Sequence, residues 1–464
     1  MPITGQLLPG VKDPVIPAYS VANSCRFNDG SSEYLHFTPS SSGNRRTMTV
    51  SVWFKGTSLA DGTNNILGQY NSSNENNSML LTIESNGRIM VWNYTTSAYT
   101  MNLRTNRLLR DPSAWYHVVV AVDTTQSTDT DRVKIYVNGV QETSFFVSTY
   151  PTQNLELFMN ENKAQNIGTQ RYGSTVGSPF DGYMAEFCFI DGQQLAPTSF
   201  GEFDEDTNIW KPIDVSGLTF GTNGYYLDFE DSSALGNDVS GNNNDFTPVN
   251  FASTDQSTDT CTNNFATMNP LAIDVSKSYT FSEGNLNISL PENAPSLATI
   301  GVSSGKWYAE VKFINNTGWH GVAPVDSGIS ANTGVIQWFM GNGLYVSGSS
   351  TATWGSSLSN NDIMGIALDM DNSRVTISQN GNWWGGSSYN QSAPHTYYSL
   401  VAGYDTYTFY GNSGNGTSSV SFNFGSPSFS ISSGNTDGNG YGNFEYSVPS
   451  GYFSLCTKNL AEYG

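Results

Sequence analysis

A short phrase that occurs twice constrains the fold of this chain most strongly. Residues 132–139 have the sequence Arg-Val-Lys-Ile-Tyr-Val-Asn-Gly, and residues 374–381 repeat it in looser form as Arg-Val-Thr-Ile-Ser-Gln-Asn-Gly. Alternating β-branched residues give each copy one apolar strand face, and the closing Asn-Gly favours a two-residue hairpin turn. A chance match between two ordinary hairpins is the alternative. The repeat predicts two all-β domains of related design.

The composition favours the same fold class. Only 13% of the 464 residues are charged, aromatic residues make up another 13%, and there are 46 glycines. Such a mixture disfavours long helices and suits short strands joined by many turns. The chain is long enough for two or three domains, each with its own core.

Charge and hydropathy restrict the partners. A formal net charge of −21 disfavours nucleic acid, whose phosphates would be repelled. No stretch approaches the roughly 18 apolar residues needed to span a bilayer, and residues 1–10 lack the basic start of a secretion signal. We therefore expect no nucleic-acid partner, no membrane insertion and synthesis in a cytoplasm.

The order of strand and turn patterns divides the chain into four parts. Four prolines in residues 1–22 predict an extended docking arm, because proline fixes φ and removes a hydrogen-bond donor. Strand patterns separated by turns follow in residues 23–200 and again in residues 271–464. Residues 201–270, between them, have the composition of a loop-rich connector.

The first strand-rich part resembles a laminin-G/concanavalin-A-like jelly roll. The resemblance rests on Trp-Tyr-His-Val-Val-Val at 115–120, the hairpin at 138–139, and Phe-Asp-Gly-Tyr-Met-Ala-Glu-Phe at 180–187. It covers roughly residues 23–200 and implies a β-sandwich.

The second strand-rich part resembles a SPRY domain. Ser-Gly-Lys-Trp-Tyr-Ala-Glu-Val at 304–311, His-Gly-Val-Ala at 320–323 and Asn-Asp-Ile-Met-Gly-Ile-Ala-Leu-Asp at 361–369 are similar to the strands of that family. Asn361 stands where the family usually has glycine, a change that a positive φ angle tolerates. The resemblance implies a second concanavalin-A-like sandwich. The expected fold class is therefore all-β, with two concanavalin-A-like β-sandwiches (laminin-G-like jelly roll, then SPRY-like) and an extended N-terminal arm.

The connector and the C-terminal end carry a further resemblance. Thr-Asn-Asn-Phe-Ala-Thr-Met-Asn-Pro-Leu at 262–271 and Val-Pro-Ser-Gly-Tyr at 448–452 are similar to recurring phrases in large virion proteins of tailed phages. With the two modules, they make nearly the whole chain resemble a phage structural or tail-fibre protein. This resemblance implies location in the virion and assembly in the host cytoplasm.

No residue pattern predicts catalysis. The four histidines are His36, His117, His320 and His395, and His117 and His320 fall inside expected strands. The alternating acids at 202–206 could form the carboxylate pair of a glycosidase, but they lie in loop-like sequence that would not hold their geometry. We therefore expect no enzyme.

Clustered acids raise Ca²⁺ as a candidate cofactor. Laminin-G-like modules often bind this cation through carboxylates and carbonyls, since it takes six to eight oxygen ligands. The candidate ligands are Asp228, Asp231, Asp238 and Asp245. An ordinary polar loop is the alternative.

Aromatic side chains near expected turns of the second module are the candidate ligand-binding set. Rings in shallow grooves stack on sugars or anchor peptides, whereas the alternative is that they fill the sandwich core. The residues selected on this basis are Trp319, His320, Trp383, Trp384, Tyr404 and Tyr407, with Trp338 and Trp354 nearby.

These expectations combine into one functional hypothesis. The chain is expected to be a phage tail fibre or surface fibre that binds a host-cell receptor, a glycan or else a protein. The arm would dock onto other virion proteins, and the fibre would be a homo-oligomer, with a trimer favoured. A capsid decoration or architectural protein without a receptor, and a polysaccharide-degrading spike, are the alternatives.

Overall fold

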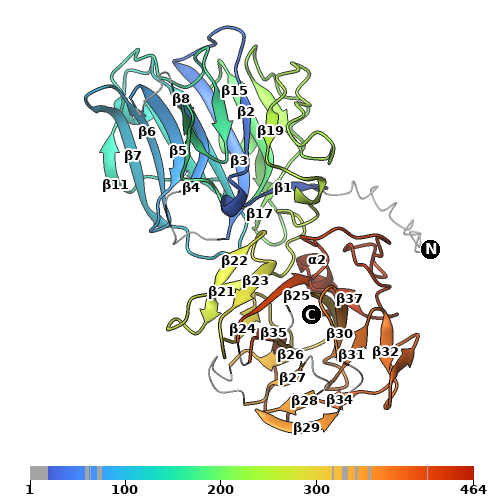
Figure 1. Cartoon of the computed structure of the whole chain (residues 1–464). Helices are drawn as coiled ribbons and strands as arrows, with labels where there is room; N and C mark the ends of the chain where they lie inside the picture. The colour runs from blue at the N-terminus through green and yellow to red at the C-terminus, as the bar shows by residue number, and fades with distance from the viewer. Residues whose placement is uncertain are drawn as a thin grey trace, which may run out of the picture.

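A computed structural model of the chain shows two lobes joined end to end (Figure 1). The structure describes residues 19–57, 62, 64–70, 76–315, 318–326, 333–339, 343–353, 357–414 and 416–464. Most of the expected N-terminal arm, residues 1–18, lies outside the described residues. Both lobes are β-sandwiches, so the expected all-β fold class is confirmed.

The first lobe consists of two eight-stranded antiparallel sheets, called here sheets A and B. Sheet A has the order β10 (Val140–Gln141), β9 (Val133–Val137), β8 (Tyr116–Asp123), β3 (Thr47–Gly56), β15 (Gly182–Asp191), β1 (Ser24–Phe27) and β20 (Gln256–Ser257), with β18 (Tyr225–Leu227) paired to β15. Sheet B has the order β11 (Phe145–Thr149), β7 (Tyr99–Leu108), β6 (Arg88–Tyr94), β5 (Ser78–Ile83), β4 (Asn64–Tyr70), β12 (Gln165–Ile167), β2 (Tyr34–Phe37) and β19 (Thr247–Val249).

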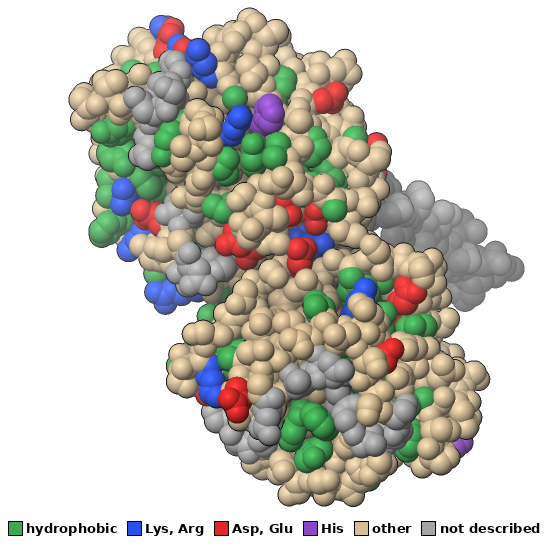
Figure 2. Space-filling model, viewed as in Figure 1, with side chains coloured by type: hydrophobic (Ala, Val, Ile, Leu, Met, Phe, Trp, Pro, Cys, Tyr) green, Lys and Arg blue, Asp and Glu red, His purple; other side chains and the backbone are tan. Residues whose placement is uncertain are grey.

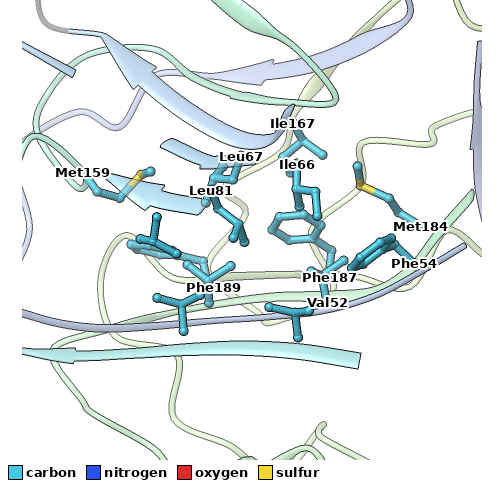
Figure 3. Packing of buried hydrophobic residues seen from close by; sticks show 14 of the residues in the cluster. Val52, Phe54, Ile66, Leu67, Leu81, Met159, Ile167, Met184, Phe187 and Phe189 are labelled. Carbon is cyan, nitrogen blue, oxygen red and sulfur yellow. The ribbon is translucent and has the colours of Figure 1, made fainter. Parts of the chain in front are cut away.

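The core of the first lobe lies between these two sheets. Figure 3 shows Val52 and Phe54 of β3 facing Ile66, Leu67 and Leu81 of β4 and β5. All five side chains are buried, and they belong to one continuous cluster. Removing this apolar surface from water is the main favourable contribution to the stability of the lobe.

The second lobe repeats the arrangement with a seven-stranded sheet C and a ten-stranded sheet D. Sheet C has the order β21 (Met268–Ile273), β24 (Ser296–Ala298), β35 (Tyr407–Asn412), β26 (Trp319–Pro324), β27 (Ile336–Phe339), β28 (Gly343–Val346) and β29 (Ser349–Thr353). Sheet D has the order β22 (Thr280–Ser282), β23 (Asn287–Leu290), β36 (Ser418–Asn423), β25 (Lys306–Asn315), β30 (Ile363–Asp369), β31 (Arg374–Gln379), β32 (Asn382–Trp384) and β33 (Tyr389–Gln391), with β34 (Tyr398–Ser399) on β31 and β37 (Phe453–Ser454) on β25.

Helices are few. The described residues contain the α-helices α1 (Asp129–Arg132) and α2 (Thr457–Tyr463). In the described part of the chain, no helix is long and apolar enough to cross a membrane. The described residues also contain two short hairpins: β13 (Gln170–Tyr172) with β14 (Thr175–Gly177), and β16 (Gly201–Phe203) with β17 (Trp210–Pro212).

The repeated phrase forms the same hairpin in both lobes, as predicted. Val137 pairs with Val140 across the first Asn-Gly turn, and Gln379 pairs with Asn382 across the second. Each phrase therefore joins an antiparallel strand pair at a corresponding place in its own sandwich.

Residues 201–270 differ from the expected connector. Their strands β18, β19 and β20 extend the two sheets of the first lobe. Tyr225 and Leu227 of β18 are buried in its core. Strands of two or three residues carry too little alternation to be recognised among turns, which is why the sequence suggested a loop-rich linker.

The outer face of sheet A is covered by the same region. Phe200, Val215 and Phe220 pack against Val119 and Ile190 of the sheet. Farther along, Trp210 packs with Trp53, joined by Val21 and the half-buried Tyr19 from the end of the expected arm. Sheet A is therefore enclosed on both faces.

The outer face of sheet D is likewise covered. Phe444 and Tyr452 of the C-terminal segment pack on Tyr308, Ala367 and Trp383 of that sheet. The outer faces of sheets B and C have no hydrophobic covering layer of this size among the described residues.

Candidate functional site

Four of the six aromatic or histidine residues predicted to bind ligand are buried, which corrects that prediction. Trp383 and Trp384 are each 3% exposed, and Tyr407 and His320 are fully buried. Trp384 and Tyr407 belong to the core between sheets C and D, and Trp383 lies beneath the C-terminal segment. Their rings supply core packing and cannot stack on a ligand in this structure.

His320 is also unsuited to proton transfer. Its ring packs between Phe313 and Phe422, and neither ring nitrogen has a hydrogen-bond partner. Burial lowers the pKa of this imidazole to about 3, because an imidazolium would be desolvated without a counter-charge. His320 is therefore neutral at physiological pH.

The other two predicted residues, Trp319 and Tyr404, are half-buried. Trp319 packs on Tyr345 with ring centroids 4.5 Å apart, on the outer face of sheet C. Tyr404 packs on Tyr407 at 6.5 Å. They belong to different aromatic groups, and their role in binding stays a prediction. Trp338 is buried in the core, and Trp354 lies outside the described residues.

The four aspartates predicted to bind Ca²⁺ cap backbone turns instead. Asp238 accepts hydrogen bonds from the backbone amides of Tyr226, Ser240 and Asn244, so both of its carboxylate oxygens are occupied. The described residues contain no group of three or more His, Cys, Asp or Glu arranged to hold a metal ion.

Asp228, Asp231 and Asp245 have the same kind of role. Their carboxylates accept from the backbone amides of Glu230, Ser233 and Asp238, respectively. This pattern is typical of aspartates in turns and does not match a cage of six to eight oxygens. It corrects the predicted calcium site.

A serine and a histidine are in contact in the first lobe, but their hydrogen bond runs in the wrong direction for a nucleophile and its base. The indole N–H of Trp210 donates to Nδ1 of His117 at 2.9 Å, so the ring proton of neutral His117 sits on Nε2. Nε2 lies 2.8 Å from Oγ of Ser51 and therefore donates to it. His117 cannot accept a proton from Ser51 in this arrangement, and its pKa is lowered to about 3 by burial.

The acids at 202–206 do not form an open carboxylate pair. Nζ of Lys211 lies 3.3 Å from Glu202 and 3.1 Å from Asp204, between the two carboxylates of the β16–β17 hairpin. Hydrogen bonds from Thr207 lower the pKa of Asp204 to about 2, so this group is not a proton donor at neutral pH.

The outer face of sheet B presents three neighbouring aromatic rings. Trp92 and Tyr94 project from β6 on the side opposite the buried Ile89 and Val91, as the period-two geometry of a strand requires. Trp92 meets Tyr99 of β7 edge to face, with centroids 5.8 Å apart. We call Trp92, Tyr94 and Tyr99 the aromatic platform.

The three rings hold one another in position. Tyr94 lies 6.4 Å from Trp92 and 5.0 Å from Tyr99, both in edge contacts. Trp92 and Tyr94 are half-buried, and Tyr99 is 44% exposed. Figure 2 shows hydrophobic side chains together with Lys or Arg side chains on the part of the upper lobe that carries β6 and β7.

Polar groups flank the platform on the same face. Asn102 of β7 is directly opposite Trp92, and Arg104 is opposite Met90. Nε of Arg104 donates to Oδ1 of Asn102 at 3.3 Å, and its Nη1 lies 3.1 Å from Oε1 of Glu84. This arrangement places an amide, a guanidinium and a carboxylate beside stacking rings, which is the chemistry that recognises sugar hydroxyls and ring faces.

The sequence contained a signal for this platform. Residues 88–94 alternate as Arg-Ile-Met-Val-Trp-Asn-Tyr, which puts Trp92 and Tyr94 on the face opposite Ile89 and Val91. The strand was expected, but which of its faces stays open depends on how the two sheets stack and on what covers their outer faces, which the sequence did not indicate.

The chain was compared with curated proteins and with solved structures. No sequence among the curated proteins matches the chain. Similar solved structures include the SPRY domain of human HERC1, with 14% identity over 33% of this chain and 96% of that one and a TM-score of 0.28. A heptameric SAP-like pentraxin from Limulus polyphemus shows 16% identity over 39% and 80% of the two chains, with a TM-score of 0.29.

A third similar structure is domain 4 of an extracellular arabinanase from Geobacillus stearothermophilus in complex with arabinotriose. It shares 22% identity over 34% of this chain and 65% of that chain, with a TM-score of 0.26. Residues 29–193 match the laminin G-type model of the concanavalin A-like lectin/glucanases superfamily. The chain is thus an all-β protein whose first lobe has a concanavalin A-like, laminin G-type fold.

Proposed function

We propose that this protein binds glycans without transforming them, and that the aromatic platform of the first lobe is its sugar-binding site. The observation that carries the proposal is the position of Trp92, half-buried on the outer face of sheet B with Tyr94 and Tyr99 at its edges. A ring fixed in this way loses little conformational freedom when it stacks on a sugar.

The neighbouring polar groups support the same function. The Glu84–Arg104–Asn102 chain is held in place by its own contacts before any ligand arrives. Such preorganised donors and acceptors fix the orientation of a ligand. The match of residues 29–193 to a superfamily of lectins and glucanases agrees with a sugar ligand.

The absence of catalysis is part of the proposal. The acids at 202 and 204 are paired through Lys211, and the imidazole of His117 is oriented as a donor toward Ser51. We expect no release of reducing ends when the protein is incubated with a polysaccharide to which it binds.

We further propose that the protein is part of a phage particle, where it serves as a tail fibre or surface fibre that attaches to host glycans. The support is the resemblance of residues 262–271 and 448–452 to phrases of virion proteins. A homotrimer of the 50.4 kDa chain would multiply weak contacts at single sites through effective concentration. Light scattering would measure the oligomer mass.

The binding proposal is tested by comparing Trp92→Ala with wild type on an immobilised panel of neutral and acidic oligosaccharides and polysaccharides. We expect wild type to bind a subset of the panel and W92A to lose about five- to thirtyfold in affinity, since one stacking contact contributes on the order of 1–2 kcal/mol. Trp92→Phe should retain part of the binding, because a smaller ring still stacks.

Trp319→Ala is the matched control, because it removes a half-buried tryptophan from the outer face of the other lobe. If W319A abolishes binding and W92A does not, the site lies on the second lobe. If wild type binds nothing on the panel, the proposal fails. Melting temperatures of all variants separate loss of binding from loss of fold.

The virion role has its own test. Antibodies raised against the purified protein are used for immunogold labelling of intact particles from an infected culture that expresses it. Label on tail or surface fibres supports attachment, and label over the capsid lattice indicates a decoration protein instead. Absence from purified particles would overturn the virion role while leaving glycan binding intact.

A further inference from the structure

A groove of about 770 Å³ lies between the two lobes. One wall comes from the first lobe, at the turn of Ser85 and Asn86 and at Arg110 just beyond β7. The other wall comes from β21, β22 and the turn between them in the second lobe, including Leu271 and Lys277. The groove is therefore present only when both lobes are.

The groove has the opposite charge to the rest of the protein. Its lining includes Arg110 and Lys277 and no carboxylate side chain, whereas the chain as a whole has a formal charge of −21. The carboxylate of Asp274, in the same turn as Lys277, accepts hydrogen bonds from Ser276. Local positive charge on an acidic protein favours an anionic ligand at this position.

Both cations can reach a ligand. Arg110 is exposed, and Lys277 is half-buried, with its Nζ donating to the backbone carbonyl of Glu292 at 2.5 Å. An ammonium group has three donors, so two remain on Lys277 for a carboxylate.

The wall formed by the second lobe is apolar and rigid. Tyr279 and Phe281 stack with ring centroids 6.2 Å apart and an interplanar angle of 21°. The Tyr279 hydroxyl donates to the carbonyl of Pro295 at 2.7 Å, which fixes that ring. Leu271 nearby is 67% exposed, a large apolar surface for an unliganded wall.

Contacts between the lobes hold the groove open. Arg26 of β1 is fully buried and lies 3.2 Å from Glu283 of the second lobe, and it also donates to the carbonyl of Pro427 at 3.3 Å. Nδ2 of Asn285 donates to the carbonyl of Thr57, which itself lines the groove, at 3.1 Å. A preformed groove binds without first ordering its walls.

Strand β6 leads from the edge of the groove to the aromatic platform. Asn86 lines the groove, and Trp92 is six residues farther along the same hairpin, a distance of roughly 20 Å at about 3.3 Å per strand residue. Arg88 and Arg104 project on this route, Arg88 over the ring of Phe146 at 4.4 Å. Arg104 has the carboxylate of Glu84 as an ion-pair partner.

We propose that the groove and the β6 face bind one chain of an acidic, carboxylate-bearing polysaccharide. Arg110 and Lys277 bind its carboxylates, the rings of Tyr279 and Phe281 form an apolar wall, and Trp92 stacks on a sugar ring farther along. This inference rests on the proposed glycan-binding function and adds the ligand class and a second point of attachment.

The test uses the full-length protein with three carboxylated polymers as probes: polygalacturonate, alginate and hyaluronate. Methyl-esterified polygalacturonate, which keeps the backbone and loses the charge, is the neutral counterpart, and a single-stranded oligonucleotide tests for polyanion binding in general. We expect wild type to bind at least one carboxylated polymer. The esterified form should bind at least about tenfold more weakly, and added salt should weaken binding to the acid form.

The decisive variant is Arg110→Gln combined with Lys277→Met. We expect it to lose about tenfold or more in affinity for the acidic polymer, through loss of two charge-assisted contacts, with no change for a neutral glycan. Arg46→Gln combined with Lys134→Met is the matched control, because it removes the same net charge at exposed or half-exposed sites away from the groove. This control should bind the acidic polymer like wild type.

The outcomes separate this inference from the function on which it rests. Equal loss in both double variants, equal affinity for acid and ester, or no binding to any carboxylated polymer would overturn the inference, while W92A-sensitive binding to a neutral glycan would leave the proposed function standing. Oligonucleotide binding as tight as polymer binding would replace it with nucleic-acid recognition. If wild type binds no glycan of any kind, both the inference and the proposed function fail.

Discussion

The ammonium group of Lys55 lies 2.7 Å from a carboxylate oxygen of Asp259, and both side chains are buried. The other oxygen of Asp259 accepts the indole N–H of Trp115 at 3.0 Å, while Nζ of Lys55 also donates to Oδ1 of Asn264 and to the carbonyl of Phe265. This pair fixes the end of sheet A to the segment that leads into the second lobe.

The first prediction follows from this pair. Asp259→Asn leaves the ammonium of Lys55 buried without a counter-charge, so we expect the free energy of unfolding to fall by about 3–5 kcal/mol. Urea denaturation followed by tryptophan fluorescence measures it. Glu156→Gln, which breaks the solvent-exposed pairs with Arg45 and Arg46, should cost less than about 1 kcal/mol. A loss of similar size in both variants would mean that breaking the buried pair costs no more stability than breaking an exposed one.

The second prediction concerns the hydrogen bond between Trp210 and His117. Trp210→Phe keeps the apolar packing but leaves Nδ1 of His117 without a donor, so we expect destabilisation by about 1–3 kcal/mol. In wild type, ¹⁵N NMR of labelled histidine should show one imidazole fixed as the Nε2–H tautomer. That imidazole should not titrate between pH 5 and pH 8, because burial lowers its pKa to about 3.

A His117 signal that titrates near pH 6.5, or a Nδ1–H tautomer, would contradict this prediction. Either result would also reopen the Ser51–His117 pair as a candidate base and nucleophile.

The third prediction is a pH dependence at Asp181. Its Oδ2 accepts from the hydroxyl of Thr57 at 2.7 Å, whereas its Oδ1 is buried without a partner, and burial raises the pKa of this carboxyl from 3.8 to about 7. The folded state thus holds the proton more tightly than the unfolded state. The stabilisation is complete below pH 3.8 and is lost as the pH rises to about 7.

Asp181→Asn removes this proton equilibrium and isolates its effect. From pH 5 to pH 8, the stability of wild type relative to D181N should fall by about 2–3 kcal/mol, as measured by urea denaturation at each pH. Asp204→Asn is the control, because a carboxyl with a pKa of about 2 stays ionised over this range. Parallel pH profiles for D181N and wild type would show that Asp181 is already ionised at pH 5.

Much of the architecture could be predicted from the sequence, because hairpins are local. Asn138 and Gly139 have φ angles of 47° and 78°, and Asn380 and Gly381 have 49° and 78°, so both turns take the left-handed conformations that Asn-Gly favours. The side chain of each asparagine also accepts from the preceding strand, from the amide of His117 in one lobe and of Ile363 in the other.

The site was harder to predict because it depends on which sheet faces are covered. Trp92 and Trp383 both lie on strands, yet Trp383 is buried under Phe444 and Tyr452 from the C-terminal segment while Trp92 stays partly open. Contacts between residues so far apart in the chain leave no local pattern. The groove was hidden for the same reason, since its two walls come from different lobes.

The fourth prediction concerns the glycines of the two repeated hairpins. A Cβ on Gly139 would come within 2.4 Å of the Trp210 ring, and one on Gly381 within 2.6 Å of the Tyr446 ring. Alanine also resists the left-handed backbone by about 1–2 kcal/mol. We therefore expect Gly139→Ala and Gly381→Ala each to lower the free energy of unfolding by more than about 2 kcal/mol, measured by urea denaturation.

Two other glycines separate the causes of this loss. Gly192 has a φ of 90° and nothing within 4 Å of an added Cβ, so Gly192→Ala should show the backbone cost alone. Gly177 has neither constraint, and Gly177→Ala should change stability by less than about 0.5 kcal/mol. If G139A costs no more than G192A, the Trp210 ring moves aside at little cost, and the aromatic cover over the first hairpin is looser than its close approach to Gly139 indicates.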